Sequence, residues 1–303
     1  LFSDFPGWAC TGHHGSIGPV FAIQHSCNVY FFHVAQLMGV DRLTNWLSQF
    51  GFGRTTGMGL NAEKPGIMPR TQGNGPARNT GIGQGELAVT PVQAANMMAT
   101  IATGKYQPLR LWLDDPSPPS DTHLEVPEQN WQLVREGMYE VVNEPGGTAF
   151  GEQRATLKDP DYVLLGKTGS AEVPRGRTIE TLYVCHFPDG RVQEVIAASK
   201  EEVLARFPPD DQPKIAGWRS YHRYPPDLPE GERYTHAWFA GYLTPRDSRL
   251  QAVTEGAGSM AIAVVIEFSG HGGDVAAPVA RSMLRAVLSR YCGRVYAASP
   301  EEE

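Results

Sequence analysis

The order of the predicted elements limits the fold of this 303-residue chain more than any other feature of its sequence. Apolar spacing with helix-start and helix-stop residues predicts four helices in the first half, over residues 18–38, 41–50, 90–104 and 127–143. Apolar and β-branched runs then predict three strands and a closing helix, over residues 162–165, 235–243, 260–268 and 275–290. Because strands and helices do not alternate, this order favours an α+β fold with an antiparallel strand pair.

Charge and hydrophobic content exclude several classes of protein. Lysine and arginine number 26 and aspartate and glutamate 33, which gives a net charge of −7, and no basic stripe runs along the chain. Phosphate recognition needs clustered basic residues, so no nucleic-acid partner is expected. Hydrophobic residues make up 41% and charged residues 19%, which is typical of a globular protein. The longest apolar run, over residues 260–266, is much shorter than the roughly 20 residues of a membrane span.

The cysteines do not form a recognisable metal or redox motif. Cys185 and Cys292 are isolated, and no C-x-x-C pair occurs. Thiol and imidazole groups are zinc ligands, and five of them lie close together in the sequence: Cys10, His13, His14, His25 and Cys27. Their spacing fits no standard zinc template, and a free cysteine is more often a small buried apolar residue. We therefore predict no metal site and no cofactor.

A Lys-Thr-Gly motif directly follows the strand predicted over 162–165. Lys167 would supply a fixed positive charge at a sheet edge, and the Thr168 hydroxyl would suit a carboxylate. Gly169 leaves room for a substrate backbone to lie against the strand. A three-residue motif is weak by itself, because an exposed lysine followed by a turn gives the same letters.

A second short motif, Ser26-Cys27-Asn28, lies inside the first predicted helix. Side chains two apart on a regular helix do not face each other, so joint use of Ser26 and Asn28 requires a turn there. Serine and asparagine are also common helix N-caps, which is the plainer interpretation of either residue alone. His25 and Cys27 do not suit a Cys-His dyad, because helical neighbours point about 100° apart.

Together the two motifs indicate a resemblance to a known protein family. Ser-x-Asn followed much later by Lys-Thr-Gly is two thirds of the signature of penicilloyl serine transferases. Further segments match one such family: SCNVYFFHVAQLMG, GFGRTTGMGL, NTGIGQGELAVTPVQAANMMATIA, LLGKTGSAE and HAWFAGYLT. In these segments the chain resembles the transpeptidase domain of class B penicillin-binding proteins. Within that class it is most similar to the elongation-type, penicillin-binding protein 2-like subgroup. The resemblance covers about residues 8–110, 127–172 and 235 to the closing helix. It implies a serine β-lactamase and transpeptidase-like fold, with helices flanking an antiparallel sheet.

The third family motif, the nucleophile motif Ser-x-x-Lys, does not occur in residues 1–303. Family order places it ahead of Leu1, and the chain also begins without a methionine or a signal peptide. We therefore expect residues 1–303 to be a partial transpeptidase domain, incomplete at its N-terminus, that is inactive and folds poorly alone. The alternative is a non-catalytic relative that keeps only a binding or scaffold function.

For the complete parent protein the resemblance implies serine acyl transfer between peptidoglycan stem peptides that end in D-Ala-D-Ala. Ser26 would relay a proton to the leaving amine, and Asn28 would orient the catalytic lysine and bind the substrate amide. Lys167 would set the electrostatics, and Thr168 would bind the terminal carboxylate. The backbone N–H of Ser170 would contribute to the oxyanion hole.

The resemblance also implies partners and a location. β-Lactams imitate D-Ala-D-Ala and would acylate the same serine, and a membrane glycosyltransferase of the elongation machinery is an expected partner. The domain would lie on the outer, periplasmic face of the cytoplasmic membrane, with its anchor outside this chain. A serine β-lactamase shares the fold and motifs, but the long Gly-rich loop and the Gly-Gln-Gly segment favour the transpeptidase.

One region departs from the family pattern. Residues 173–234, with eight prolines, lie where the family has a short connection. A hairpin is predicted over 178–186 and 191–198, around the turn Pro188-Asp189-Gly190, followed by a short helix over 200–207. We interpret 173–234 as an insertion, for which a solvated elaboration is favoured over a lid or a partner surface.

Overall fold

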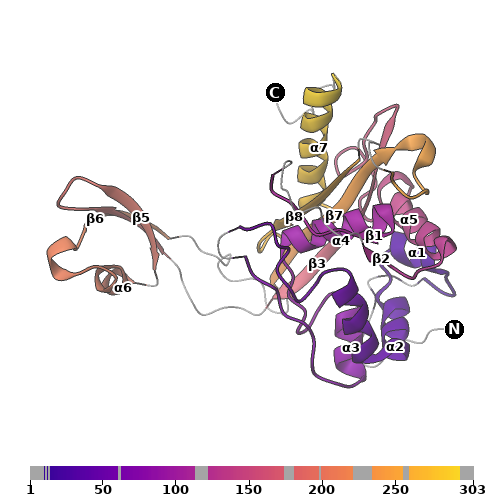
Figure 1. Ribbon diagram of the computed structural model, residues 1–303, viewed down its shortest axis with the longest axis horizontal. Helices are drawn as coiled ribbons and strands as arrows, with labels where there is room; N and C mark the ends of the chain where they lie inside the picture. Colours follow the sequence, from indigo (N-terminus) through magenta and orange to yellow (C-terminus); the bar gives the residue numbers. More distant parts are fainter. Residues whose placement is uncertain are drawn as a thin grey trace. The chain divides into compact units, whose positions relative to one another are not determined.

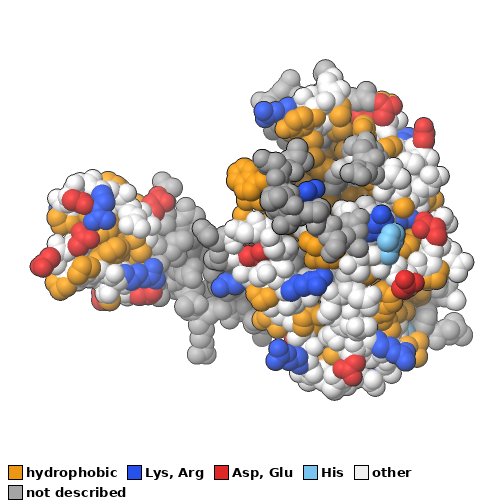
Figure 2. Space-filling model, viewed as in Figure 1, with side chains coloured by type: hydrophobic (Ala, Val, Ile, Leu, Met, Phe, Trp, Pro, Cys, Tyr) orange, Lys and Arg blue, Asp and Glu red, His pale blue; other side chains and the backbone are white. Residues whose placement is uncertain are grey.

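The computed structural model describes residues 10, 12, 14–60, 63–112, 122–173, 181–197, 199–220, 234–254 and 259–293. The chain forms two compact units (Figure 1). The first unit comprises Leu1–Ala171, His236–Ile266 and Gly270–Glu303, and the second comprises Glu172–Thr235 with Glu267–Ser269. Basic and acidic side chains are interspersed on the face shown in Figure 2, as the absence of a basic stripe in the sequence predicts.

The first unit is organised around a three-stranded sheet. Its strands are β3 (Tyr162–Val173), β7 (Tyr234–Pro245) and β8 (Met260–Ile266), in the order β3-β7-β8. β7 and β8 pair antiparallel with Gly241 opposite Ile262, which confirms the predicted strand pair. β3 is longer than the predicted strand, which ended before Gly166. A Cβ at Gly166 would lie 2.4 Å from the Phe239 ring, so this glycine allows close approach of β7 and does not end the strand.

Alternating side chains fill both faces of this sheet. Leu164 of β3 packs in one buried cluster with Phe239 of β7 and with α7 (Ala276–Cys292). Leu165 points to the other face, where the cluster includes α4 (Pro91–Thr103) and α5 (Glu128–Asn143). This period of two is what a strand buried on both faces requires. The sheet, with β3 at its edge, is therefore held between helices (Figure 1).

The first predicted helix is broken in two. α1 (Pro19–Gln24) and α2 (Asn28–Gln49) are separated by a turn at residues 25–27, so the prediction of one helix over 18–38 was wrong. Gly39 does not end a helix either: its φ of 74° makes a kink inside α2, which continues through the predicted second helix. Periodicity did not detect the turn because its residues keep the apolar spacing of a helix.

Further elements complete the first unit. α4 begins as predicted, since Thr90 forms a capping box with Gln93, and α5 lies within one residue of its predicted start. α3 (Asn74–Gly81) is not among the predicted helices, because its sequence is rich in glycine and proline. It forms against α2, where Arg78 donates two hydrogen bonds to Gln36. The short strands β1 (Lys105–Tyr106) and β2 (Thr122–His123) pair antiparallel, and a one-turn helix η2 (Arg246–Ser248) follows β7.

The second unit has its own sheet and core. β4 (Thr181–His186) lies between β5 (Val192–Ala197) and β6 (Lys214–Ser220), and α6 (Lys200–Ala205) and the one-turn η1 (Pro209–Asp211) lie between β5 and β6. The predicted hairpin and helix are confirmed, whereas no strand was predicted where β6 lies. The core consists of Tyr183, Cys185, Phe187, Val195, Ala197 and Val203. Residues 174–180 and 221–233 lie outside the described residues, and the interpretation of 173–234 as an insertion stays a prediction.

Within the described part of the chain, none of the helices combines the length and the apolar character that crossing a membrane would need.

Candidate active site

The fold brings Ser26 and Lys167 together, although they lie 141 positions apart in the sequence. Lys167 Nζ on β3 donates to Ser26 Oγ over 2.9 Å. The same ammonium group donates to the Thr168 carbonyl oxygen at 2.9 Å and lies 3.5 Å from the Thr168 hydroxyl oxygen. A cation next to two hydroxyl groups can donate a hydrogen bond to one of them. It can also attract an anion that the other hydroxyl group binds.

Ser26 owes its position to the turn between α1 and α2. Its φ is 52°, a left-handed conformation that costs a non-glycine residue about 1–3 kcal/mol. Backbone hydrogen bonds stabilise the turn: Ser26 N–H donates to the Ile23 carbonyl at 3.2 Å, and Cys27 N–H to that of Ala22 at 2.9 Å. The turn directs the Ser26 hydroxyl toward Lys167 on β3.

Asn28 is the first residue of α2 and is half-buried. Among the described residues its side chain makes no hydrogen bond. The structure therefore places Asn28 two residues from Ser26 without showing a contact to Lys167, and its role stays a prediction.

Desolvation sets the electrostatic state of Lys167. Removal from water lowers the pKa of its ammonium group from 10.5 to about 8, because burial penalises the charged form. Within the described residues no carboxylate pairs with it. A lysine with a pKa of about 8 is still charged at neutral pH and loses its proton above pH 8. A site that needs this charge should therefore lose activity above pH 8.

Three side chains that sequence reasoning missed support the Lys-Thr-Gly-Ser segment. The Thr148 hydroxyl lies 2.7 Å from the Thr168 hydroxyl, and Gln84 Nε2 donates to the Ser170 carbonyl oxygen at 3.1 Å. His271 Nδ1 lies 3.3 Å from Ser170 Oγ. Gln84 lies in the Gly-Gln-Gly segment that carried the family resemblance, whereas no sequence signal indicated Thr148 or His271.

The loop before α7 lies directly against this segment. A Cβ at Gly272 would be 2.1 Å from the Trp238 carbonyl oxygen and 2.4 Å from that of Gly169. A Cβ at Gly273 would be 2.2 Å from the Thr148 carbonyl oxygen. These approaches require glycine at both positions, so the loop is fitted closely against β3 at the predicted substrate-binding residues.

A separate cluster of ligand atoms lies beside Ser26. Potential ligand atoms of Cys10, His14 and Cys27 are all within 4.8 Å of one another, and burial raises the pKa of the Cys27 thiol. Thiolate and imidazole form the donor set that zinc prefers, and a tetrahedral zinc ion would need a fourth ligand. Burial, with the charge of His14, lowers the pKa of His25, and His13 lies outside the described residues. The fold thus brings together three potential metal ligands whose spacing in the sequence fits no standard zinc template.

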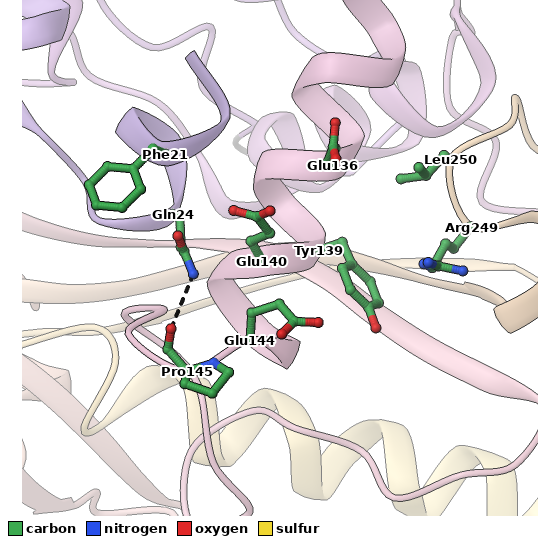
Figure 3. A pocket seen from close by; sticks show the side chains of 9 residues that line it. All are labelled: Phe21, Gln24, Glu136, Tyr139, Glu140, Glu144, Pro145, Arg249 and Leu250. Atoms are coloured by element: carbon green, nitrogen blue, oxygen red, sulfur yellow. Dashed lines mark hydrogen bonds between the residues drawn. The ribbon is translucent and has the colours of Figure 1, made fainter. Parts of the chain in front are cut away.

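A cavity of about 500 Å³ lies next to α1, between Phe21, α5 and Arg249 (Figure 3). Glu136, Glu140 and Glu144 line it from one side of α5, and Gln24 Nε2 donates to the Pro145 carbonyl oxygen at its edge. Burial and repulsion by the two neighbouring carboxylates raise the pKa of Glu140. None of the predicted site residues lines this cavity, so it is distinct from the candidate active site.

The chain matches the family model of the penicillin binding protein transpeptidase domain over residues 3–183. A curated relative, the peptidoglycan D,D-transpeptidase MrdA of Salmonella typhimurium, is 33% identical over 187 residues, which cover 55% of this chain and 29% of that protein. MrdA of Haemophilus influenzae is 28% identical over 306 residues, covering 94% of this chain and 38% of that protein. The chain thus spans about a third of the length of these relatives.

Solved structures share the fold. The complex between penicillin-binding protein PBP2 and MreC from Helicobacter pylori contains a chain that matches with a TM-score of 0.59 at 23% identity, over 90% of this chain and 41% of that one. The predicted α+β fold of the transpeptidase type, with an antiparallel sheet flanked by helices, is confirmed.

Proposed function

This chain belongs to the penicillin-binding protein transpeptidase family, and we propose on that premise that it contributes Ser26, Asn28 and Lys167 to a peptidoglycan D,D-transpeptidase. The observation that carries the proposal is the 2.9 Å hydrogen bond from Lys167 Nζ to Ser26 Oγ. Residues 1–303 contain no Ser-x-x-Lys motif, and we propose that the nucleophile is supplied by such a motif elsewhere in a longer protein, which is called the complete enzyme below.

The proposed first step forms an acyl-enzyme. The nucleophilic serine oxygen adds to the carbonyl carbon of the penultimate D-alanine, and the C–N bond to the terminal D-alanine breaks. Ser26 passes the serine proton to the leaving amine, with its hydroxyl polarised by the Lys167 ammonium group. In the second step an amine of a neighbouring stem peptide attacks the ester carbon and the C–O bond to the serine breaks. The amine gives up a proton that returns to the serine oxygen through Ser26, which leaves the cross-link and the free serine.

The edge of β3 is the proposed binding site for the donor peptide. Thr168 and Lys167 receive the terminal carboxylate, and Gly169 leaves space for the peptide backbone beside the strand. The backbone N–H of Ser170 stabilises the oxyanion of the tetrahedral intermediate. Asn28, at the start of α2, orients the catalytic lysine and binds the substrate amide.

We also propose a setting for this activity. The complete enzyme acts on the periplasmic face of the cytoplasmic membrane in cell-wall synthesis that maintains cell shape, with a glycosyltransferase supplying glycan strands. The Helicobacter pylori relative forms a complex with MreC, and a protein of that type is a candidate partner. Residues 1–303 are a partial transpeptidase domain in which 173–234 form an insertion.

Exposure of the complete enzyme to a fluorescent penicillin tests this function. We expect one covalent adduct per molecule that persists for hours, because a transpeptidase gives water no efficient access to the acyl ester. Release within seconds would identify a β-lactamase. Absence of any adduct, in a protein shown to be folded by its cooperative thermal melt, would identify a non-catalytic binding protein.

A further inference from the structure

His271 lies at the mouth of the candidate active site, in the loop between β8 and α7. It is exposed, and its Nδ1 atom is 3.3 Å from Ser170 Oγ. The neighbouring backbone N–H of Gly272 donates to the same oxygen at 3.4 Å. Because Gly272 and Gly273 are fitted tightly against the sheet and the Thr148 loop, the backbone next to His271 is held close to Ser170.

Ser170 lies two positions after Thr168 on β3, so both hydroxyl groups lie on the same face of the strand. The Thr168 hydroxyl is already close to Thr148 and to the Lys167 ammonium group. A carboxylate has two oxygen atoms, and two neighbouring hydroxyl groups can each donate to one of them. Ser170 is therefore suited to be the second donor to a carboxylate held by Thr168.

The hydrogen of the Ser170 hydroxyl can be given to one acceptor at a time. When His271 is neutral and protonated at Nε2, its Nδ1 atom accepts this hydrogen. When both ring nitrogens are protonated, Nδ1 can only donate to Ser170 Oγ. The Ser170 hydroxyl must then donate elsewhere, and the imidazolium adds positive charge to the site.

We propose that His271 is a positioning residue whose protonation turns the Ser170 hydroxyl toward the carboxylate of the bound peptide or penicillin. The inference rests on the proposed function and specifies which protonation state of the site binds the carboxylate. Histidine changes charge between about pH 5 and 8, so acidification within that range strengthens carboxylate recognition.

Other charged groups lie on the elements that carry this pair and on the strand next to β3. β3 carries Lys167 and Glu172, β7 carries His236, and Asp274 on the same loop pairs with Arg154 at 2.7 Å. Lys167 titrates on the alkaline side of this range, with a pKa of about 8. The comparison is therefore made between pH 7 and pH 5, where Lys167 keeps most of its charge, and asks whether a change in affinity requires both His271 and Ser170.

The test is the pH profile of acylation of the complete enzyme by a fluorescent penicillin, with prereaction affinity and the acylation step measured separately. In the wild type, affinity should rise severalfold from pH 7 to pH 5, and by at most about tenfold, as expected for one added hydrogen bond to a charged group. In His271→Asn the amide can donate to Ser170 Oγ at every pH, so affinity should stay high and flat. In His271→Ala no imidazole competes for the Ser170 hydrogen, and the Gly272 N–H still donates to Ser170 Oγ, so the profile should be flat and close to that of His271→Asn.

Two control variants test whether His271 acts through Ser170. Ser170→Ala should abolish the pH dependence, and adding His271→Asn to it should change nothing further, because His271 acts through Ser170. His186→Asn, an exposed histidine of the second unit, should leave the wild-type profile unchanged. A pH-dependent affinity that persists in His271→Asn would overturn the inference while the proposed function stands. Absence of acylation in the wild type at every pH would instead overturn the proposed function.

Discussion

Replacing Lys167 with methionine should lower the rate constant for acylation of the complete enzyme by about 10²–10³-fold and should also make the folded protein more stable. The loss of rate follows because the ammonium group is the cation that donates to Ser26 Oγ and lies beside the Thr168 hydroxyl. Methionine has a similar volume but neither the charge nor a hydrogen to donate. Fluorescent penicillin labelling measures the rate.

The gain in stability follows from the lowered pKa of Lys167. The unfolded chain holds the Lys167 proton up to about pH 10.5, whereas the folded protein releases it near pH 8. Between these values the unfolded state binds more protons, so wild-type stability should rise with pH from about 8 to 10.5. Below pH 8 the desolvated charge costs stability, and Lys167→Met should remove about 1–3 kcal/mol of that cost. The variant should lack the alkaline rise.

Lys158→Met is the matched control for both measurements. Lys158 is exposed and forms a surface ion pair with Glu152, so its replacement should change stability by less than about 1 kcal/mol and leave acylation unchanged. The account of Lys167 is contradicted if Lys167→Met labels at the wild-type rate. It is also contradicted if that variant keeps the alkaline rise in stability.

The second large effect should come from Arg135 of α5, whose side chain is completely buried. Its Nε atom donates to the Ile101 carbonyl oxygen at 3.1 Å, and one terminal nitrogen donates to Glu128 at 2.8 Å and to the Leu250 carbonyl oxygen at 3.2 Å. These bonds tie α5 to the end of α4 and to the loop after β7. Arg135→Ala should therefore destabilise the complete enzyme by about 3–5 kcal/mol, because it leaves a cavity and buried carbonyl groups without donors.

Denaturant unfolding of the Arg135 variants separates packing from hydrogen bonding. Arg135→Met keeps most of the side-chain volume and should regain part of the stability that Arg135→Ala loses. The difference in the free energy of unfolding between these two variants measures the cost of the cavity. Arg206→Ala removes an exposed pair with Glu202 on α6 and should cost less than about 1 kcal/mol. An Arg135→Ala variant as stable as wild type would show that the buried guanidinium does not hold these segments together.

Local signals explain which parts of the fold could be predicted. α4 has a capping box and a clear apolar period, and β7 and β8 are long apolar runs joined by a turn, so all three were found. α3 was missed because its sequence favours loops and its helix is stabilised by contacts with α2 that lie 42 positions away. The break before α2 was missed because Ser26 adopts a left-handed conformation that no residue preference announces.

In the candidate site, too, some residues could be recognised from short motifs, whereas others are brought together only by tertiary packing. Ser26 and Lys167 lie in motifs short enough to recognise, and the structure brings them into contact. Thr148 and His271 are single residues on loops, and only tertiary packing brings their side chains to Thr168 and Ser170. The ligand atoms of Cys10, His14 and Cys27 meet for the same reason, since the turn before α2 folds Cys27 back toward the earlier residues.

The most direct test of the central claim is to measure D-alanine release and cross-link formation together. The complete enzyme is incubated with glycan strands that carry pentapeptide stems, and the Ser26→Ala variant serves as comparison. We predict one D-alanine released for each cross-link, with both rates at least about a hundredfold lower in Ser26→Ala, because the proton relay to the leaving amine is lost. Equal rates in wild type and Ser26→Ala, or D-alanine release without cross-links, would contradict the account.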